Sequence, residues 1–186
     1  MIGFVAACGG GGTGPGTGVT RADLLAIGRA DATDPAPATF VFKNNELRTF
    51  QLRHSDSSQT LFATFTFTPR SIVSRNDTLL CDTCTVAITV SVTAGSYEFT
   101  VGPSTLVFNE TGEPIVAVSY GTYGDASVYT MSTRYASASA FSQALGVWHE
   151  RTVDHWVLGR NSTHTGPDEV TSAMEGPGAY LLAAPK

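Results

Sequence analysis

Two histidines on either side of a predicted turn are the residues with the clearest potential for metal chemistry. His149 and His155 are separated by five residues, two of them acidic. A zinc motif of the HExxH type needs its histidines four positions apart on a helix, and this spacing does not provide it. If the segment is a hairpin, the two histidines could lie opposite each other, with His164 as a third ligand. The alternative, which we prefer, is a pair of ordinary cross-strand polar residues beside two tryptophans, with no metal.

A second pair of reactive residues is the CxxC sequence formed by Cys81 and Cys84. A structural zinc site would need a second ligand pair at similar spacing, and the sequence has no other CxxC. A thioredoxin-like redox pair begins a helix beside a βαβ unit, whereas this pair precedes an alternating β-type segment. In an exported protein the simplest reading is a disulfide that closes a turn. We therefore predict a Cys81–Cys84 disulfide.

Other catalytic patterns do not occur. The sequence contains no GxSxG nucleophile elbow, no glycine-rich phosphate loop before a helix and no assignable pair of catalytic carboxylates. The net charge is −5, and the 11 lysines and arginines are scattered along the chain. Nucleic-acid binding needs clustered basic residues, so we exclude that class of partner. We expect no catalysis and no cofactor.

Aromatic residues in the second half of the chain support a binding hypothesis instead. Exposed tyrosine and tryptophan side chains, together with nearby histidines, could contact an envelope protein or a glycan. Burial of both tryptophans would favour a structural role. The predicted binding surface consists of Tyr123, Tyr129, Tyr135, Trp148, His149 and His155.

The first eight residues, MIGFVAAC, resemble the end of a bacterial lipoprotein signal peptide. Residues 5–8 match the lipobox pattern of an aliphatic residue, two small residues and the cysteine that is acylated. Seven residues precede Cys8 and none is basic, whereas a working signal has a positive start and an apolar stretch of about 7–15 residues. We therefore read residues 1–8 as a truncated signal. The alternative is a chance match in an N-terminal tail.

If Cys8 carries several acyl chains, it anchors the protein stably to a membrane, because each buried CH₂ contributes about 0.8 kcal/mol. The expected location is the cell envelope, as a lipoprotein of the outer membrane or periplasm. Residues 9–37 are predicted to be a Gly/Pro-rich tether. A short helix within it, over 19–32, would be capped by Thr20 and Asp23. The domain itself is assigned to 38–186.

Alternation of apolar and small polar residues predicts that this domain is all-β. The pattern is most regular in residues 85–120, which we divide into four short strands separated by turns. About a dozen strands in all predict a single antiparallel β-sandwich, immunoglobulin-like or ZU-five-like. Two hairpins are expected, one of 40–42 with 47–53 and one of 145–150 with 155–158. Between them, a strand should bury Leu61, Ala63, Phe65 and Phe67 and turn Phe62 away from the core. The remaining elements are strands at 126–131, 169–173 and 179–183, a loop or short helix at 135–144, and a loop at 161–167.

The region from residue 61 to 186 resembles the ZU-five-type β-sandwich of some ankyrin, netrin-receptor and bacterial surface proteins. The matching motifs are Pro69 to Ile72, Ala87 to Val90, Gly102 to Asn109 with Pro114, Trp156 to Leu158, and Gly178 to Ala183. The chain departs from that family between Tyr123 and Ala144. The resemblance implies a non-enzymatic structural or interaction module and carries over no catalytic residues. We thus expect a membrane-anchored structural or protein-interaction domain; the alternative is a carbohydrate- or peptide-binding module of the envelope.

Overall fold

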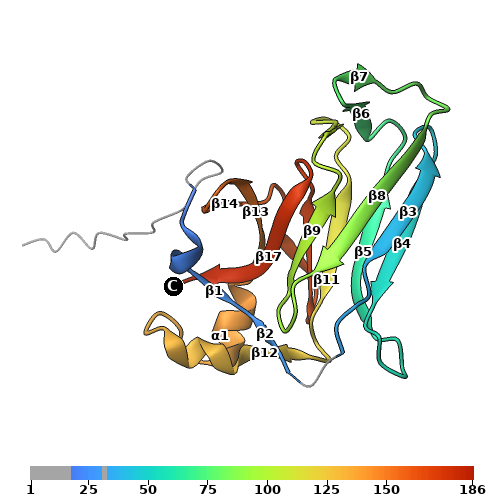
Figure 1. The fold of residues 1–186 in the computed structure, drawn as a ribbon. Coiled ribbons are helices and arrows are strands. Elements are labelled where there is room, and N and C mark those ends of the chain that lie inside the picture. Colours follow the sequence, from blue (N-terminus) through green and yellow to red (C-terminus); the bar gives the residue numbers. More distant parts are fainter. Residues whose placement is uncertain (1–17, 31–32) are drawn as a thin grey trace, which may run out of the picture.

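The computed structural model describes residues 18–30 and 33–186, and two antiparallel sheets stacked face to face form its body (Figure 1). Cys8, the lipobox and the first part of the predicted tether lie outside the described residues. The larger sheet has the order β14-β13-β17-β9-β8-β3, with β1 also paired to β17, and the smaller has the order β15-β16-β11-β5-β4. The protein is therefore an all-β sandwich, as predicted.

The larger sheet consists of β1 (Leu24–Ala26), β3 (Ala38–Lys43), β8 (Thr85–Val92), β9 (Glu98–Gly102), β13 (Gly146–Thr152), β14 (His155–Leu158) and β17 (Gly178–Pro185). The smaller sheet consists of β4 (Arg48–Arg53), β5 (Leu61–Phe67), β11 (Ile115–Ser119), β15 (Thr163–Gly166) and β16 (Glu169–Ala173). One end of the sandwich carries β6 (Ile72–Arg75), β7 (Thr78–Leu79) and β10 (Leu106–Phe108) (Figure 1). The other end carries β2 (Gly28–Arg29), β12 (Gly124–Asp125), the 3₁₀-helix η2 (Ala126–Met131) and the helix α1 (Ala138–Gln143) (Figure 1).

The core lies between the two sheets and is rich in aromatic rings. Period-two alternation turns one face of each strand inward, as in β8, where Val86, Ile88 and Val90 are buried. Rings from the two sheets then meet across the gap: the Phe42 and Phe67 centroids are 4.7 Å apart. Such aromatic pairs contribute about 0.5–1.5 kcal/mol each beyond the area they bury.

All four strands predicted in residues 85–120 are present as β8, β9, β10 and β11. They do not form one meander, because β10 belongs to the end sheet and β11 to the smaller main sheet. The hairpin predicted for 40–42 and 47–53 is wrong for a related reason. Here β3 pairs with β8 and β4 with β5, so the turn between β3 and β4 crosses from one sheet to the other. Buried Asn44 holds that turn, since its side-chain Nδ2 donates to the Ile72 carbonyl at 2.9 Å.

The predicted helix over 19–32 is also wrong. Only the 3₁₀ turn η1 (Arg21–Asp23) forms, and the Thr20 hydroxyl donates to the Asp23 carboxylate at 2.7 Å. The chain then enters the larger sheet as β1, with buried Leu24 and Leu25 packing on different clusters. The described second part of the predicted tether therefore belongs to the folded domain, which begins before residue 38.

Phe62 faces the core, contrary to the expectation that it faces away. Leu52 pairs with Ala63 and Arg53 pairs with Leu61, so Phe62 is the extra residue of a β-bulge. The bulge reverses the alternation, which leaves Phe62 fully buried and Leu61 partly exposed. The predicted strand at 126–131 is instead η2, the predicted loop at 161–167 contains β15, and the region 135–144 contains the short helix α1. The hairpin of β13 and β14 is confirmed.

No helix in the described parts of the chain is long and apolar enough to cross a membrane.

Candidate functional site

The cysteine pair behaves as predicted. Cys81 and Cys84 form a disulfide with their Cα atoms 5.0 Å apart, at the turn that leads into β8. The Arg70 guanidinium donates two hydrogen bonds, of 2.9 and 2.6 Å, to the carboxylate of Asp82 in the same turn. The bridge therefore stabilises a local turn at the end of the sandwich that carries β6 and β7.

The structure separates the three histidines of the zinc hypothesis. In the hairpin register His149 lies opposite Val157, whereas His155 lies opposite Thr152. His149 is buried and stacks on Tyr180 with the ring centroids 4.4 Å apart, and His155 is exposed. Within residues 18–30 and 33–186, no three His, Cys, Asp or Glu side chains gather in a way that could hold a metal. The arrangement that a zinc site needs is therefore not formed by these residues.

Burial also takes Trp148 out of the predicted binding surface. Trp148 and Trp156 are 2% and 3% exposed and pack with Leu24 and Leu181, and the Trp148 indole donates to the Ala183 carbonyl at 3.0 Å. This arrangement is structural.

All three predicted tyrosines are only partly exposed. Tyr129 and Tyr135 pack on the main core from η2 and the segment after it. Tyr135, Trp148 and His164 are brought together at the edge of one hollow of about 420 Å³. The predicted binding surface is therefore divided among separate sites.

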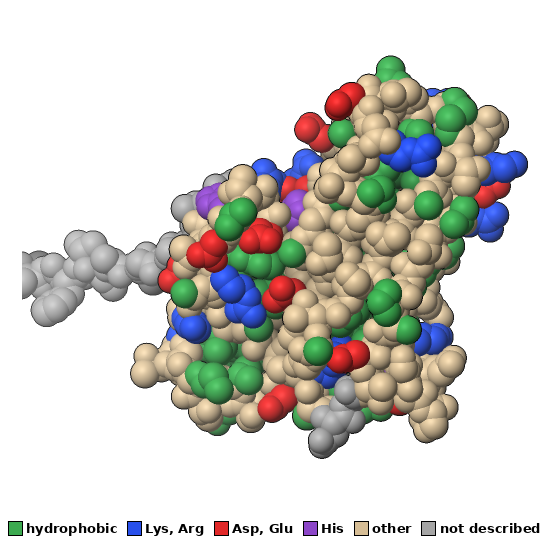
Figure 2. Space-filling model, in the orientation of Figure 1, with side chains coloured by type: hydrophobic (Ala, Val, Ile, Leu, Met, Phe, Trp, Pro, Cys, Tyr) green, Lys and Arg blue, Asp and Glu red, His purple; other side chains and the backbone are tan. Residues whose placement is uncertain are grey.

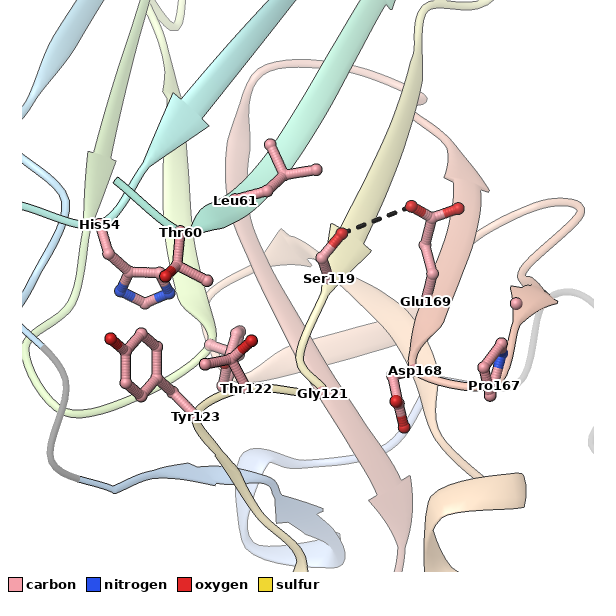
Figure 3. A pocket seen from close by; sticks show the side chains of 12 residues that line it. His54, Thr60, Leu61, Ser119, Gly121, Thr122, Tyr123, Pro167, Asp168 and Glu169 are labelled. Carbon is pink, nitrogen blue, oxygen red and sulfur yellow. Dashed lines mark hydrogen bonds between the residues drawn. The ribbon is translucent and has the colours of Figure 1, made fainter. Parts of the chain in front are cut away.

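Tyr123 is placed differently, because it lines a separate hollow. This hollow has a volume of about 530 Å³ and lies at the end of the sandwich that carries β2 and β12 (Figure 3). Its wall residues come from the ends of several strands of both sheets, as is typical of binding sites supported by a rigid scaffold. His54, Thr60, Tyr97, Ser119, Asp168 and Glu169 are among them.

His54 follows β4 and forms one wall of the hollow beside Thr60 and Tyr123 (Figure 3). It is 2% exposed, and its Nδ1 lies 3.1 Å from the Thr33 carbonyl oxygen. Because a carbonyl can only accept, this contact assigns the proton to Nδ1 and leaves Nε2 as an acceptor. Nε2 is buried and has no hydrogen-bond partner among the described residues. Burial lowers the pKa of His54, and Arg29 lowers it further, so the ring is neutral.

Behind this wall lies the side chain of Arg29, which is fully buried and forms an ion pair with Asp34. Its guanidinium carbon is 5.7 Å from the centre of the Phe62 ring and 5.9 Å from that of Tyr97. Contacts of this kind between a cation and an aromatic face contribute about 0.5–2 kcal/mol. Burial lowers the pKa of Arg29 and raises that of Tyr97. The back of the hollow is therefore a buried positive charge with aromatic neighbours.

The Tyr123 ring is held by a short chain of hydrogen bonds. Its hydroxyl donates to Asp56 Oδ2 at 2.6 Å, and Asp56 Oδ1 accepts from the Thr60 backbone N–H at 3.1 Å. The bond from Tyr123 lowers the pKa of Asp56 and raises that of the tyrosine. Tyr123 also meets the His54 ring edge to face, with centroids 4.8 Å apart. The ring is thus positioned before any ligand arrives.

The opposite wall carries two acidic residues. Glu169 accepts a hydrogen bond from the Ser119 hydroxyl at 3.4 Å (Figure 3) and another from the Thr165 hydroxyl at 2.6 Å. Asp168 is exposed and packs on Gly121, where an added Cβ would come within 2.6 Å of the carboxylate. Glycine is needed at position 121 because of this close approach.

The hollow contains a serine, a histidine and acids, but their contacts are not those of a catalytic triad. A nucleophilic serine needs a hydrogen bond to its base, and here Ser119 bonds to Glu169 while His54 bonds to the Thr33 carbonyl. What the arrangement offers is recognition: fixed acceptors, an oriented aromatic ring and two hydroxyls.

Of the residues that line this hollow, only Tyr123 belongs to the binding surface predicted from the sequence; His54 does not, nor does the neighbouring Arg29. The only local signal at His54 was the run His-Ser-Asp-Ser-Ser after a strand, a polar loop of the kind that carries functional residues. The burial of Arg29 beside the hollow could not be predicted, because the sequence of residues 19–32 predicts a helix.

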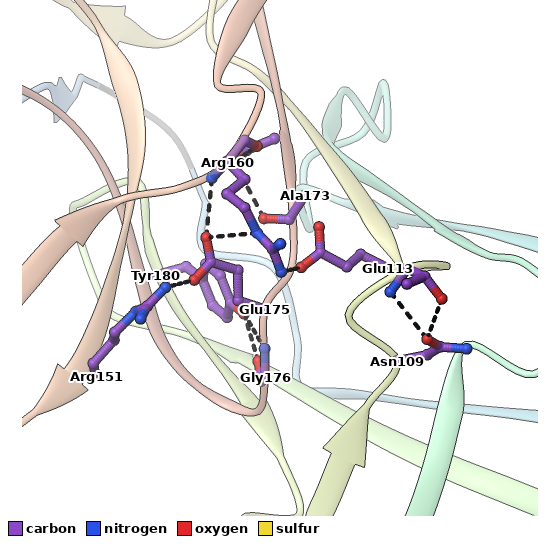
Figure 4. A network of polar contacts seen from close by, with 10 residues as sticks. Asn109, Glu113, Arg151, Arg160, Ala173, Glu175, Gly176 and Tyr180 are labelled. Carbon is purple, nitrogen blue, oxygen red and sulfur yellow. Dashed lines mark hydrogen bonds and ion pairs between the residues drawn. The ribbon is translucent and has the colours of Figure 1, made fainter. Parts of the chain in front are cut away.

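A second polar cluster, on the edge formed by β13, β16 and β17, is structural. Glu175 is bound by both Arg151 and Arg160, and Arg160 also pairs with Glu113 (Figure 4). The Tyr180 hydroxyl donates to the Gly176 carbonyl four residues upstream, which is the tyrosine-corner arrangement of Greek-key sandwiches. The cluster ties the loops before β11 and β17 to the β13–β14 hairpin.

On the face shown in Figure 2, basic and acidic side chains alternate and form no basic stripe.

Comparisons with known proteins identify no relative. No family model matches the chain, and no curated protein or solved structure matches it significantly. The class of the protein, an antiparallel β-sandwich, therefore rests on the structure itself, and the ZU-five resemblance stays a prediction.

Proposed function

We propose that the protein is a membrane-anchored β-sandwich module of the bacterial cell envelope that binds a partner outside the cytoplasm and catalyses no reaction. The observation that carries this proposal is the hollow beside His54. It combines an oriented Tyr123 ring with an unpartnered buried acceptor, and its serine and histidine are bonded to other groups. A concave site with a few convergent polar groups is the usual form of a ligand site.

The N-terminal segment supports the anchoring part of the proposal. Val19 and Trp156 exchange two backbone hydrogen bonds of 2.8 Å, and the Arg21 N–H donates to Asp154 at 2.7 Å. The described chain therefore leaves the domain beside the β13–β14 hairpin. Nine residues separate Cys8 from Gly18, and the fully extended chain between these two residues would span at most about 36 Å. An acylated Cys8 would hold the domain close to a membrane surface.

The anchor is tested by metabolic labelling with a palmitate analogue. The gene is expressed with its natural upstream sequence, beside a Cys8→Ser variant. Label and membrane fractionation that both depend on Cys8 are the expected result. Absence of Cys8-dependent label would refute the anchor.

The binding part is tested separately by photo-crosslinking in cells. A photoreactive phenylalanine analogue replaces Tyr123 in one strain and the exposed Val153 in a control strain. An adduct that forms only from position 123 is expected. If neither position, or both equally, gives adducts, the hollow is not a binding site.

A further inference from the structure

We propose that the hollow beside His54 binds a neutral, hydroxyl-rich ligand, namely a saccharide of one or two sugar rings. This inference rests on the binding function proposed above and names the chemical class of the ligand. It follows from the hydrogen-bonding capacity of the walls, from their charges and from the aromatic ring.

The walls of the hollow combine hydroxyl groups with two acceptors that cannot donate, at His54 and Asp168. His54 Nε2 is an acceptor because Nδ1 donates to the Thr33 carbonyl. The Asp168 carboxylate, on the opposite wall, has no hydrogen-bond donor when it is ionised, so it can act only as an acceptor. A buried acceptor without a partner destabilises the protein, and a donor from a ligand would recover that loss. The matching ligand must therefore carry several donors, as the hydroxyl groups of a sugar do.

The charges around the hollow favour a neutral ligand. An anion would meet Asp168 and Glu169 at the wall. A cation would approach the buried Arg29 guanidinium, which contacts the Phe62 and Tyr97 rings and is only partly balanced by its ion pair with Asp34. Donors without net charge can bind near the acidic wall and near Arg29 alike, so hydroxyl groups fit the hollow better than ammonium or guanidinium groups.

The shape of the hollow agrees with a small sugar. Its volume of about 530 Å³ lies within the range of about 300–1,000 Å³ that is usual for small-molecule sites. Tyr123 and Leu61 give it apolar surface, and the hydrogen bond to Asp56 fixes the tyrosine ring. A sugar ring has an apolar C–H face as well as hydroxyls at its edge, so it can lie on the tyrosine ring while its hydroxyls reach the Asp168 carboxylate and the wall that contains His54.

His149 provides an internal comparison. Its Nε2 lies 3.3 Å from the Pro177 carbonyl, and its Nδ1 is buried without a partner. This ring is stacked on Tyr180 and borders none of the hollows described here. Both histidines bear an unpartnered nitrogen, but only His54 belongs to the wall of a space that a ligand can enter.

The test is an NMR titration of the full ¹⁵N-labelled chain with glucose, N-acetylglucosamine, maltose, cellobiose and chitobiose. At least one saccharide should give saturable shifts of the Gly121 and Thr122 amides and move the Nε2 resonance of His54 upfield, as expected when a lone pair accepts a hydrogen bond. Tyr123→Ala should weaken the affinity at least tenfold, while Tyr129→Ala, the matched control, should leave it within twofold.

A second variant guards against misfolding. Tyr123→Phe keeps the ring and loses only the bond to Asp56, so it should fold and weaken the affinity less than Tyr123→Ala. The inference is overturned if no saccharide shifts these amides, or if lysine amide or methylguanidinium binds there instead. A protein crosslinked through position 123 in cells, together with no saccharide binding, would reject the saccharide and leave the binding function standing.

Discussion

Acidification should destabilise this protein before its carboxylates begin to titrate, because His149 and His54 are buried in their neutral forms. They are 6% and 2% exposed, and burial is the main cause that lowers each pKa. For His149, the nitrogen that would take up the proton is Nδ1, which faces no hydrogen-bond partner in the described structure. A charge there would be both desolvated and unpaired.

The sign follows from the proton balance. In the unfolded chain a histidine takes up a proton near pH 6.5, while in the folded protein the lowered pKa delays that uptake. The unfolded state therefore binds more protons below pH 6.5, and stability falls as the pH falls. The stability is fully present above the unfolded pKa. The loss continues until the pH reaches the lowered pKa of the folded state.

The size of the effect has a ceiling. A histidine that stays neutral in the folded protein costs up to about 1.3 kcal/mol between pH 7.0 and 5.5, with a limiting slope of about 1.4 kcal/mol per pH unit. Two such histidines give up to about 2.5 kcal/mol, a large part of a typical stability of 5–15 kcal/mol. Carboxylates titrate near pH 4, and the pKa of Asp56 is lowered further by Tyr123, so this window reports histidine.

The assay is urea unfolding at pH 7.0, 6.5, 6.0 and 5.5, followed by fluorescence of the two buried tryptophans. His149→Phe keeps an aromatic ring against Tyr180 and should reduce the pH dependence by about half, whatever its effect on stability at pH 7. His155→Phe, at an exposed position, is the matched control and should change it little. A wild-type free energy of unfolding that is flat from pH 7.0 to 5.5, or an undiminished slope in His149→Phe, would refute the reasoning.

Two further substitutions and the reduction of the disulfide test the contacts that stabilise the fold. Glu175→Gln should lower the free energy of unfolding by about 1–3 kcal/mol, because the 7% exposed Glu175 side chain joins two half-exposed arginines. The control Glu46→Gln, which breaks an exposed ion pair, should lower it by less than about 1 kcal/mol. Equal losses in the two variants would contradict the stabilising role of Glu175. Tyr180→Phe should lower the free energy of unfolding by about 1–2 kcal/mol, because it removes the buried hydrogen bond of the tyrosine hydroxyl. Denaturant unfolding measures this change, and an unchanged midpoint would show that the hydrogen bond does not stabilise the fold. Reduction of the Cys81–Cys84 disulfide should lower the free energy of unfolding by about 2 kcal/mol on the loop-entropy formula; two free thiols by mass spectrometry in periplasm-derived protein would show that the bridge does not form.

The strands of this protein could be predicted from the sequence, whereas the pairing of those strands could not. Alternation within Thr85–Val92 is local, so β8 is evident from the sequence alone. Its partner β3 lies more than 40 residues away, and nothing in residues 38–53 indicates that β3 and β4 belong to different sheets. Their separation depends on buried contacts of the turn, such as that of Asn44 with Ile72, which involve residues distant in sequence.

The predictions of secondary structure and side-chain direction are wrong where the backbone near the candidate site is irregular. The bulge at Phe62 turns its ring into the core, where it stacks on Tyr97 with centroids 5.3 Å apart and faces Arg29. Strict alternation would have placed that ring outside. The η2 helix follows the short strand β12, which pairs with β2 and so fixes the loop that carries Tyr123. Neither feature has a period that a sequence pattern can reveal.

The two buried histidines show why residue type alone could not locate the site. His149 was selected because it lies near a second histidine, two acids and two tryptophans, yet all of these are ordinary parts of a hairpin. His54 has no such neighbours in the sequence. Its environment comes from Thr33, Phe62 and Tyr123, which converge on it only in the folded chain. The imidazoles are chemically alike, each neutral with one nitrogen that has no partner among the described residues, so the hollow beside His54 is what makes His54, and not His149, the candidate binding residue.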